Sequence, residues 1–283
     1  MPVWVLHFAV FLFGMASLFG EGLTIGIYHL VFFRCFFAFL GLSGIQILLK
    51  EKIRIYFPVF FGQALLLCLH WISFFYAVQY GSLALAVISF SSYPLFSFII
   101  DLNQNKIKNI VKNLFCIGLI VFGIIVLSYE SFKEFQLISL CAGIFSALSF
   151  SVLMYYNQKK ATAYQTIQIA LSQNFISFLL LTPFVVIDYR TLMQWDHQTW
   201  IFLFLLGLVF TALSHSLFLW AAAKLSGTFV AMVASMEPLY AILFSWILFG
   251  SRPSSGEWLG GIFIIVALFI YSSDWKKKDF ELK

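Results

Sequence analysis

Charged residues are scarce in this chain of 283 residues. Lysine and arginine number 17 and aspartate and glutamate 12, so the chain is 10% charged, where a soluble domain carries about 25%. Hydrophobic residues make up 62%, and no polar stretch is long enough to fold outside lipid. The composition therefore excludes a separate catalytic domain or nucleic-acid module and predicts an integral membrane protein.

Paired cysteines and catalytic motifs are also missing. The four cysteines stand singly in apolar runs, without the close pairing of disulfide frameworks, metal sites or redox motifs. No Walker-type glycine loop, HExxH or paired acidic motif occurs. We therefore expect no metal, no cofactor, no ATP-driven transport and no enzymatic activity. The cysteines are Cys35, Cys68, Cys116 and Cys141.

Ten apolar segments predict ten transmembrane helices, since roughly 20 apolar residues cross a bilayer. The alternation typical of membrane strands is absent, so the expected fold class is an all-α integral membrane protein. Charges, glycines, prolines and asparagines separate the segments. The expected spans are residues 3–20, 24–48, 57–79, 82–100, 110–128, 136–156, 166–187, 198–222, 228–249 and 257–273.

The distribution of basic residues predicts the orientation. Thirteen of the 17 lysines and arginines fall in one set of alternate loops and tails, three in the other set, and one within a span. Basic loops usually stay in the cytoplasm. We therefore expect a multi-pass protein of the cytoplasmic (inner) membrane with both termini in the cytoplasm. This role of the basic residues also explains the net charge of +5 without a nucleic-acid partner.

An internal repeat relates the two halves of the chain. At an offset of 144 residues, HWISFFYAVQYGSLALAVISFSSYPLF aligns with SHSLFLWAAAKLSGTFVAMVASMEPLY, and at 139 FFRCFFAFL aligns with LSQNFISFL. The chain divides into five-span halves, 1–130 and 135–274, followed by a basic cytoplasmic tail at 275–283. Because five is odd, the repeat is inverted, which is typical of secondary transporters with a central site. A duplicated membrane protein without a transport role is the alternative.

At these residues the chain resembles the EamA-type branch of the drug/metabolite transporter superfamily. The resemblance rests on LHWISFFYAVQYGSLALAVISFSSYPLF, on an arginine in the second span, and on SMEPLYAILFSWILFGSRPSSGEWLGGIFIIVAL. It implies ten helices with a central cavity between spans one to four and six to nine, the fifth and tenth being peripheral. Family members carry amino acids, other metabolites, nucleotide derivatives or drugs. They commonly have a glutamate soon after the fourth and ninth spans, where this chain has Asp101 and Ser251.

Two charged residues are expected deep in the membrane. Glu237 lies roughly 14 Å into the ninth span, where a carboxylate costs several kcal/mol unless it is protonated, paired or hydrated. It could exchange a proton or contact substrate, or it could be a neutral group at a kink made by Pro238. Arg34 lies at a similar depth. It could pair with Glu237, bind an anionic group of the solute, or serve only as a packing anchor.

Aromatic residues and histidines are the other candidates for the site. His70, Phe74 and Ala77 share one helical face in the third span, and such a wall suits a planar or amphipathic solute. Lipid-facing packing is the alternative for most individual aromatic residues. On the seventh span we expect the face of Thr166, Gln173 and Ser177 to look inward. The predicted substrate-binding residues are Arg34, His70, Trp71, Phe74, Tyr93, Gln173, His215, Trp220, Glu237 and Tyr240.

Prolines and glycines suggest how the helices move and pack. Pro94 and Pro238 occupy equivalent positions in the two halves, so paired kinks could act as hinges. A static cavity shape is the alternative. Gly256, Gly260 and Gly261 form a small-residue motif that could pack the tenth span against the fifth or against a second copy in a homodimer.

The sequence favours a secondary active transporter of a small organic metabolite across the cytoplasmic membrane, working by alternating access with proton coupling or exchange. The solute would be an amino acid, a nucleotide derivative or an amphipathic compound, and the expected partners are this solute and the lipid bilayer. The alternative is a lipid flippase-like or membrane assembly component. The sequence leaves the substrate, the direction of transport, the coupling ion and the oligomeric state undetermined.

Overall fold

A computed structural model describes residues 1–20, 25–81, 83–104, 109–129, 136–250 and 252–272. These residues form helices and connecting turns, without strands, so the predicted all-helical class is confirmed. The predicted tail at 275–283 lies outside the described residues, as do Lys106, Lys108, Lys133 and Ser251. The elements are α1 (Pro2–Gly20), α2 (Ile27–Leu48), α3 (Phe57–Tyr80), α4 (Leu83–Phe90), α5 (Tyr93–Asn103), α6 (Ile110–Ser128), α7 (Leu137–Lys160), α8 (Thr166–Ile187), α9 (Tyr189–Leu192), α10 (His197–Gly207), the π-helical turn η2 (Leu208–Leu213), α11 (Ser214–Ala222), α12 (Gly227–Ala234), α13 (Glu237–Phe249) and α14 (Ser255–Ser272).

Polar residues set several of the helix ends. Asn109, Asp196 and Ser226 each precede a helix, and the side-chain oxygen of each accepts a hydrogen bond from a backbone N–H in the first turn. At the other end of α13, Gly250 adopts a left-handed conformation with φ 69°, which glycine accepts without strain. The beginnings of α6, α10 and α12 and the end of α13 therefore lie where local capping chemistry favours them.

Nine helical segments in the described residues are long and apolar enough to cross a membrane. They correspond to the second to tenth predicted spans. The first predicted span corresponds to α1, a helix of 19 residues that contains the apolar stretch Pro2–Ala16. A multi-pass membrane protein is therefore supported, while a tenth crossing stays a prediction.

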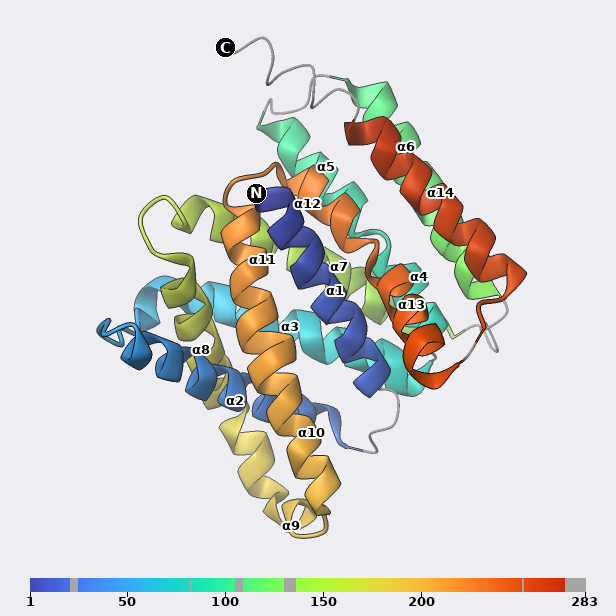
Figure 1. Cartoon of the computed structure of the whole chain (residues 1–283). Coiled ribbons are helices and arrows are strands. Elements are labelled where there is room, and N and C mark those ends of the chain that lie inside the picture. The colour runs from blue at the N-terminus through green and yellow to red at the C-terminus, as the bar shows by residue number, and fades with distance from the viewer. Residues whose placement is uncertain (21–24, 82, 105–108, 130–135, 251, 273–283) are drawn as a thin grey trace.

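Helices from the two halves of the chain pack against each other (Figure 1). Contacts between the halves join, among others, α3 with α7, α2 with α8, α1 with α11, α1 with α13 and α5 with α12. The two halves are thus interleaved rather than separate lobes. Any cavity in the middle of the bundle must therefore be lined by both of them.

Helices α6 and α14 form a separate pair at one side of the molecule (Figure 1). Glycines allow their backbones to approach closely, because a Cβ at Gly260 would clash with the carbonyl oxygen of Gly123 and lie 2.6 Å from the Cβ of Leu127. A Cβ at Gly261 would meet Leu239 at 3.0 Å. Of the two predicted roles of the glycine motif, packing within the chain is therefore the one that the structure shows. A homodimer stays a prediction.

Candidate functional site

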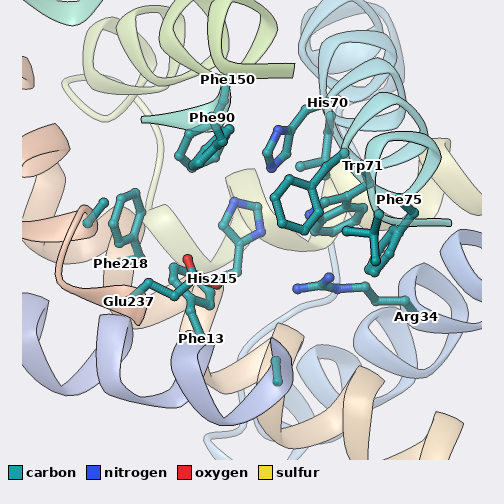
Figure 2. A pocket seen from close by; sticks show the side chains of 15 residues that line it. Phe13, Arg34, His70, Trp71, Phe75, Phe90, Phe150, His215, Phe218 and Glu237 are labelled. Carbon is teal, nitrogen blue, oxygen red and sulfur yellow. The ribbon is translucent and has the colours of Figure 1, made fainter. Parts of the chain in front are cut away.

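A cavity of about 100 Å³ lies in the middle of the helix bundle. This is room for several water molecules or a small organic group. Its walls come from α1, α2, α3 and α4 in the first half and from α7, α11, α12 and α13 in the second. The lining residues are Phe13, Ala16, Arg34, Leu67, His70, Trp71, Phe74, Phe75, Val78, Phe90, Phe150, His215, Phe218, Ala234 and Glu237 (Figure 2).

Two spans are interrupted beside this cavity. The fourth span changes from α4 to α5 at residues 91–92, and the ninth changes from α12 to α13 at residues 235–236. Pro94 and Pro238 are each the second residue of the new helix, where a missing N–H costs little. The predicted kinks are thus interruptions of the helical ladder. Whether they act as hinges stays a prediction.

The second interruption brings Glu237 to the cavity. Glu237 is the first residue of α13, and the positive end of a helix dipole favours a carboxylate there. Its side chain is only partly exposed and lines the cavity. Broken helices whose ends point at a central site are typical of transporter binding sites.

Arg34 enters the cavity from α2 and is held on two sides. Its Nε donates a hydrogen bond to Thr211 Oγ1 at 2.7 Å, and its guanidinium carbon lies 4.4 Å from the ring centroid of Trp71. The side chain is buried, 8% exposed as a residue. Desolvation makes such an arginine–aromatic contact stronger than an exposed one.

Arg34 and Glu237 share the cavity without forming an ion pair. Within the described residues no nitrogen–oxygen distance between them is as short as 4.0 Å, although each charge acts on the other electrostatically. His215 lies between them in the view of Figure 2. Of the alternatives that the sequence left open for Arg34, direct pairing with Glu237 is therefore absent in this structure, which leaves both groups available to a third partner.

His215 is buried in the cavity wall with unused hydrogen-bonding capacity. It is 3% exposed, and neither ring nitrogen has a hydrogen-bond partner among the described residues. A neutral imidazole offers one donor and one acceptor, and leaving them unpaired costs about 1–3 kcal/mol each. A solute or water molecule that bonded to His215 would recover this cost.

His70 is fixed by a serine on α7. Ser146 Oγ donates to the backbone carbonyl of His70 at 3.0 Å, so the hydroxyl proton of Ser146 is not available for a second hydrogen bond. The contact of 2.8 Å between Ser146 Oγ and His70 Nδ1 must then have Nδ1 as the donor. This leaves Nε2 of His70 as a hydrogen-bond acceptor.

Aromatic side chains form the apolar part of the cavity. The ring of Phe150 stacks on His70 with a centroid distance of 4.5 Å and lies 5.9 Å from the ring of Phe218. Phe90 and Phe74 lie 5.7 Å apart in an edge-to-face arrangement. Such walls bind apolar or planar groups by contact area and ring geometry rather than by hydrogen bonds.

Six of the ten predicted substrate-binding residues meet at this cavity. They are Arg34, His70, Trp71, Phe74, His215 and Glu237. Tyr93, by contrast, is fully buried behind the wall, with its ring 5.0 Å from that of Phe150. The predicted wall residue Ala77 is also completely buried and lies outside the lining.

Gln173, Trp220 and Tyr240 lie outside the cavity lining and bind other residues of the chain. Gln173 is fully buried and donates to Asn157 Oδ1 at 2.5 Å. Trp220 makes a cation–π contact with Lys224, whose Nζ is 3.6 Å from the centroid of the indole ring. The hydroxyl of Tyr240 lies 2.9 Å from Nδ1 of His7.

The face of the seventh span that was predicted to look inward is buried at Gln173 and Ser177, but α8 contributes no residue to the cavity lining. Ser177 on α8 is fully buried and donates to the carbonyl of Ala64 at 3.2 Å. Thr166, at the beginning of α8, is partly exposed. This face of α8 therefore packs within the bundle.

The cavity also contains residues that the sequence did not single out. Phe13, Phe75, Phe150 and Ala234 line it, and Thr211 supports Arg34 from the π-helical turn. The internal repeat indicates some of these lining residues, because positions that align between the two halves both line the cavity. At the offset of 144, Phe90 aligns with Ala234 and Trp71 with His215, and both members of each pair line the cavity.

No group of three histidine, cysteine or acidic residues in the described part of the chain is arranged to hold a metal ion. Cys35, Cys68 and Cys116 are buried and Cys141 is exposed, and no disulfide joins these four cysteines. The chemistry of the cavity is therefore supplied by one guanidinium, one carboxyl group, two imidazoles and aromatic rings.

Comparisons with known proteins bear on the family and the fold of this chain. The model of the EamA-like transporter family matches residues 137–273. A solved crystal structure of a protein has the same fold, with a TM-score of 0.79 over 95% of this chain and 96% of that chain. The two sequences are 12% identical, so this likeness shows the fold alone. No protein of curated function matches the sequence.

Proposed function

We propose that this protein is a secondary active transporter that carries a small organic metabolite across the membrane by alternating access, because residues 137–273 match the model of the EamA-like transporter family. The observation that carries the proposal is the central cavity, in which Arg34 and Glu237 face each other without pairing. Uncompensated charge inside a membrane protein is costly and marks substrate or ion pathways.

We propose further that the chain is an inverted repeat of two five-span halves. In such a repeat α1 is equivalent to α7, α3 to α11 and α5 to α13. The contact of α3 with α7 should therefore have a counterpart between α11 and α1, and the contact of α5 with α7 should have one between α13 and α1. All four of these contacts occur. The aligned cavity pairs Trp71 with His215 and Phe74 with Phe218 support the same relation.

The contact between α5 and α12 has no counterpart of similar extent in the other half, and this asymmetry supports alternating access. Helix α5 packs against α12 at one end of the cavity, and the carboxylate of Asp101 accepts two hydrogen bonds from Thr228 there. The equivalent pair, α13 and α4, has no comparable packing within the described residues. A transporter closed at one end has this arrangement, and exchanging the two contacts would open the cavity to the other side.

The cavity favours a solute with an apolar body and a polar end. Its aromatic walls offer contact area, while Arg34, His215 and Glu237 supply charge and hydrogen bonding at one part of the surface. An amino acid or an amphipathic compound fits this combination better than a fully polar solute, whose groups would lie unpaired against phenyl rings.

A thermal-shift screen tests whether the protein binds such solutes. A ligand that binds only the folded state raises the unfolding temperature. We expect amphipathic and zwitterionic metabolites to stabilise the purified protein, and fully polar sugars to leave it unchanged. A panel of metabolites without any stabilising member would contradict the proposed function.

Proton coupling through Glu237 leads to a specific prediction. Replacing Glu237 with glutamine should abolish the response of uptake to an imposed pH gradient in proteoliposomes, because an amide cannot exchange a proton at neutral pH. The solute is the best stabiliser from the screen. Glu51→Gln, at an exposed position, is the matched control and should keep the response. An unchanged pH response in Glu237→Gln would exclude this glutamate as the coupling group.

A further inference from the structure

The eighth span packs closely against α2 next to the π-helical turn η2. A Cβ on Gly207, directly before the turn, would clash with Phe37 and lie 3.1 Å from the carbonyl oxygen of Arg34. Such turns insert one extra residue into a helix and are frequent at functional sites. Here the turn carries Thr211, whose side chain reaches Arg34.

The direction of the Thr211 hydrogen bonds follows from their geometry. Its hydroxyl donates to the carbonyl of Leu206 at 2.8 Å, so its single proton is used. The oxygen is then an acceptor for the Nε–H of Arg34 at 2.7 Å. Thr211 is completely buried, so water cannot easily replace it as the acceptor. Together with the ring of Trp71 on one face, it fixes the plane of the guanidinium.

This arrangement leaves one edge of the guanidinium unused. Arginine has five N–H donors in a planar fork, and Thr211 takes the one on Nε. Among the described residues no hydrogen bond reaches the terminal nitrogens Nη1 and Nη2 of Arg34. These two nitrogens match the two oxygens of a carboxylate or phosphate group, which bind such a fork in a bidentate manner.

We propose that Thr211 is a positioning residue that holds Arg34 so that Nη1 and Nη2 bind an anionic oxygen group of the solute. The inference rests on the proposed function and adds a substrate class to it: solutes with an apolar or aromatic body and a carboxylate or phosphate-type group. The aromatic rings receive the body, and Arg34 selects the anion. Thr211 itself does not touch the solute.

Isothermal titration of the purified protein with three matched probes tests this assignment. The probes are L-phenylalanine, its amide, and its phosphonate analogue, which differ only in the group offered to Arg34. We expect the wild-type protein to bind at least one of the two acids about tenfold more tightly than the amide. The tighter of the two identifies the solute group as carboxylate or phosphate-type.

Thr211→Val keeps the shape of the side chain and removes the acceptor. We expect this variant to lose most of the preference for the acid, with an unchanged affinity for the amide, whereas Thr211→Ser should retain the preference. A Thr211→Val protein with wild-type preference would overturn the inference. Equal affinity of the wild-type protein for the acids and the amide would also overturn it, while leaving transport standing. Failure of the proposed function would instead show as a metabolite screen that finds no ligand.

A second measurement needs no ligand. The chain contains four arginines, so the Nε–H signal of Arg34 can be assigned in ¹⁵N-arginine-labelled protein by its loss in Arg34→Lys. We expect slow hydrogen exchange of this proton in the wild type and in Thr211→Ser, and faster exchange in Thr211→Val. Equal exchange in the wild type and Thr211→Val would overturn the positioning role, even if the valine variant lost its preference through misfolding.

Discussion

Replacing Asp101 with alanine is expected to lower the free energy of unfolding by about 3 kcal/mol. Asp101 is 2% exposed, and its Oδ2 accepts from the backbone N–H of Thr228 at 2.7 Å and from the hydroxyl at 2.8 Å. These bonds cap the beginning of α12 from a helix in the other half of the chain. Alanine would leave both donors buried and unpaired. Reversible unfolding in mixed micelles gives the value.

Asp101→Asn is the matched control for this experiment. Both hydrogen bonds from Thr228 go to the same oxygen, so the amide oxygen of asparagine can keep them while the charge is lost. We expect less than half of the alanine effect. Equal losses for alanine and asparagine would show that the charge rather than the capping bonds stabilises this end of the bundle.

Replacing Gly207 with valine is expected to cost about 3 kcal/mol and to remove solute binding. The valine side chain would push α2 away from η2, because its Cβ clashes with Phe37 and approaches the backbone of Ala38 at 3.2 Å. Separation of α2 from the turn also breaks the contact between Arg34 and Thr211. Unfolding in mixed micelles and thermal-shift binding measure the two effects.

Gly118→Ala is the control for the Gly207 variant. Gly118 lies within α6, and a Cβ there would meet nothing within 4 Å. Alanine at this position should leave stability unchanged or raise it by up to about 1 kcal/mol through helix propensity. A Gly207→Val protein as stable as Gly118→Ala would mean that the close packing of α2 on η2 is not required.

The sequence predicted the parts of this structure that depend on hydrophobicity and buried charge. Apolar run length determined the spans, and the cost of charge in lipid identified Arg34 and Glu237 as cavity residues. The proline pair correctly marked where the fourth and ninth spans are interrupted. Each of these inferences follows from local chemistry that requires no knowledge of the neighbouring helices.

The remaining site residues depend on helix rotation and on partners distant in sequence. Trp220 lies five residues after His215, about 140° around the helix, so it faces Lys224 instead of the cavity. Gln173 aligns with Arg34 in the repeat, but Asn157 on α7 satisfies its amide. Thr211 gained its role through one π-helical turn, and no hydrophobic pattern reveals the extra residue of such a turn.

The central claim is that the solute passes through the cavity between the two halves. Ala234 lines it at the position that aligns with Phe90, so Ala234→Phe places a phenyl ring in a space of about 100 Å³. Val111→Phe, on an exposed helix surface, adds the same side chain elsewhere. In proteoliposomes loaded for counterflow of the best stabilising solute, we expect wild-type uptake for Val111→Phe and none for Ala234→Phe. Wild-type uptake by a folded Ala234→Phe protein would contradict it.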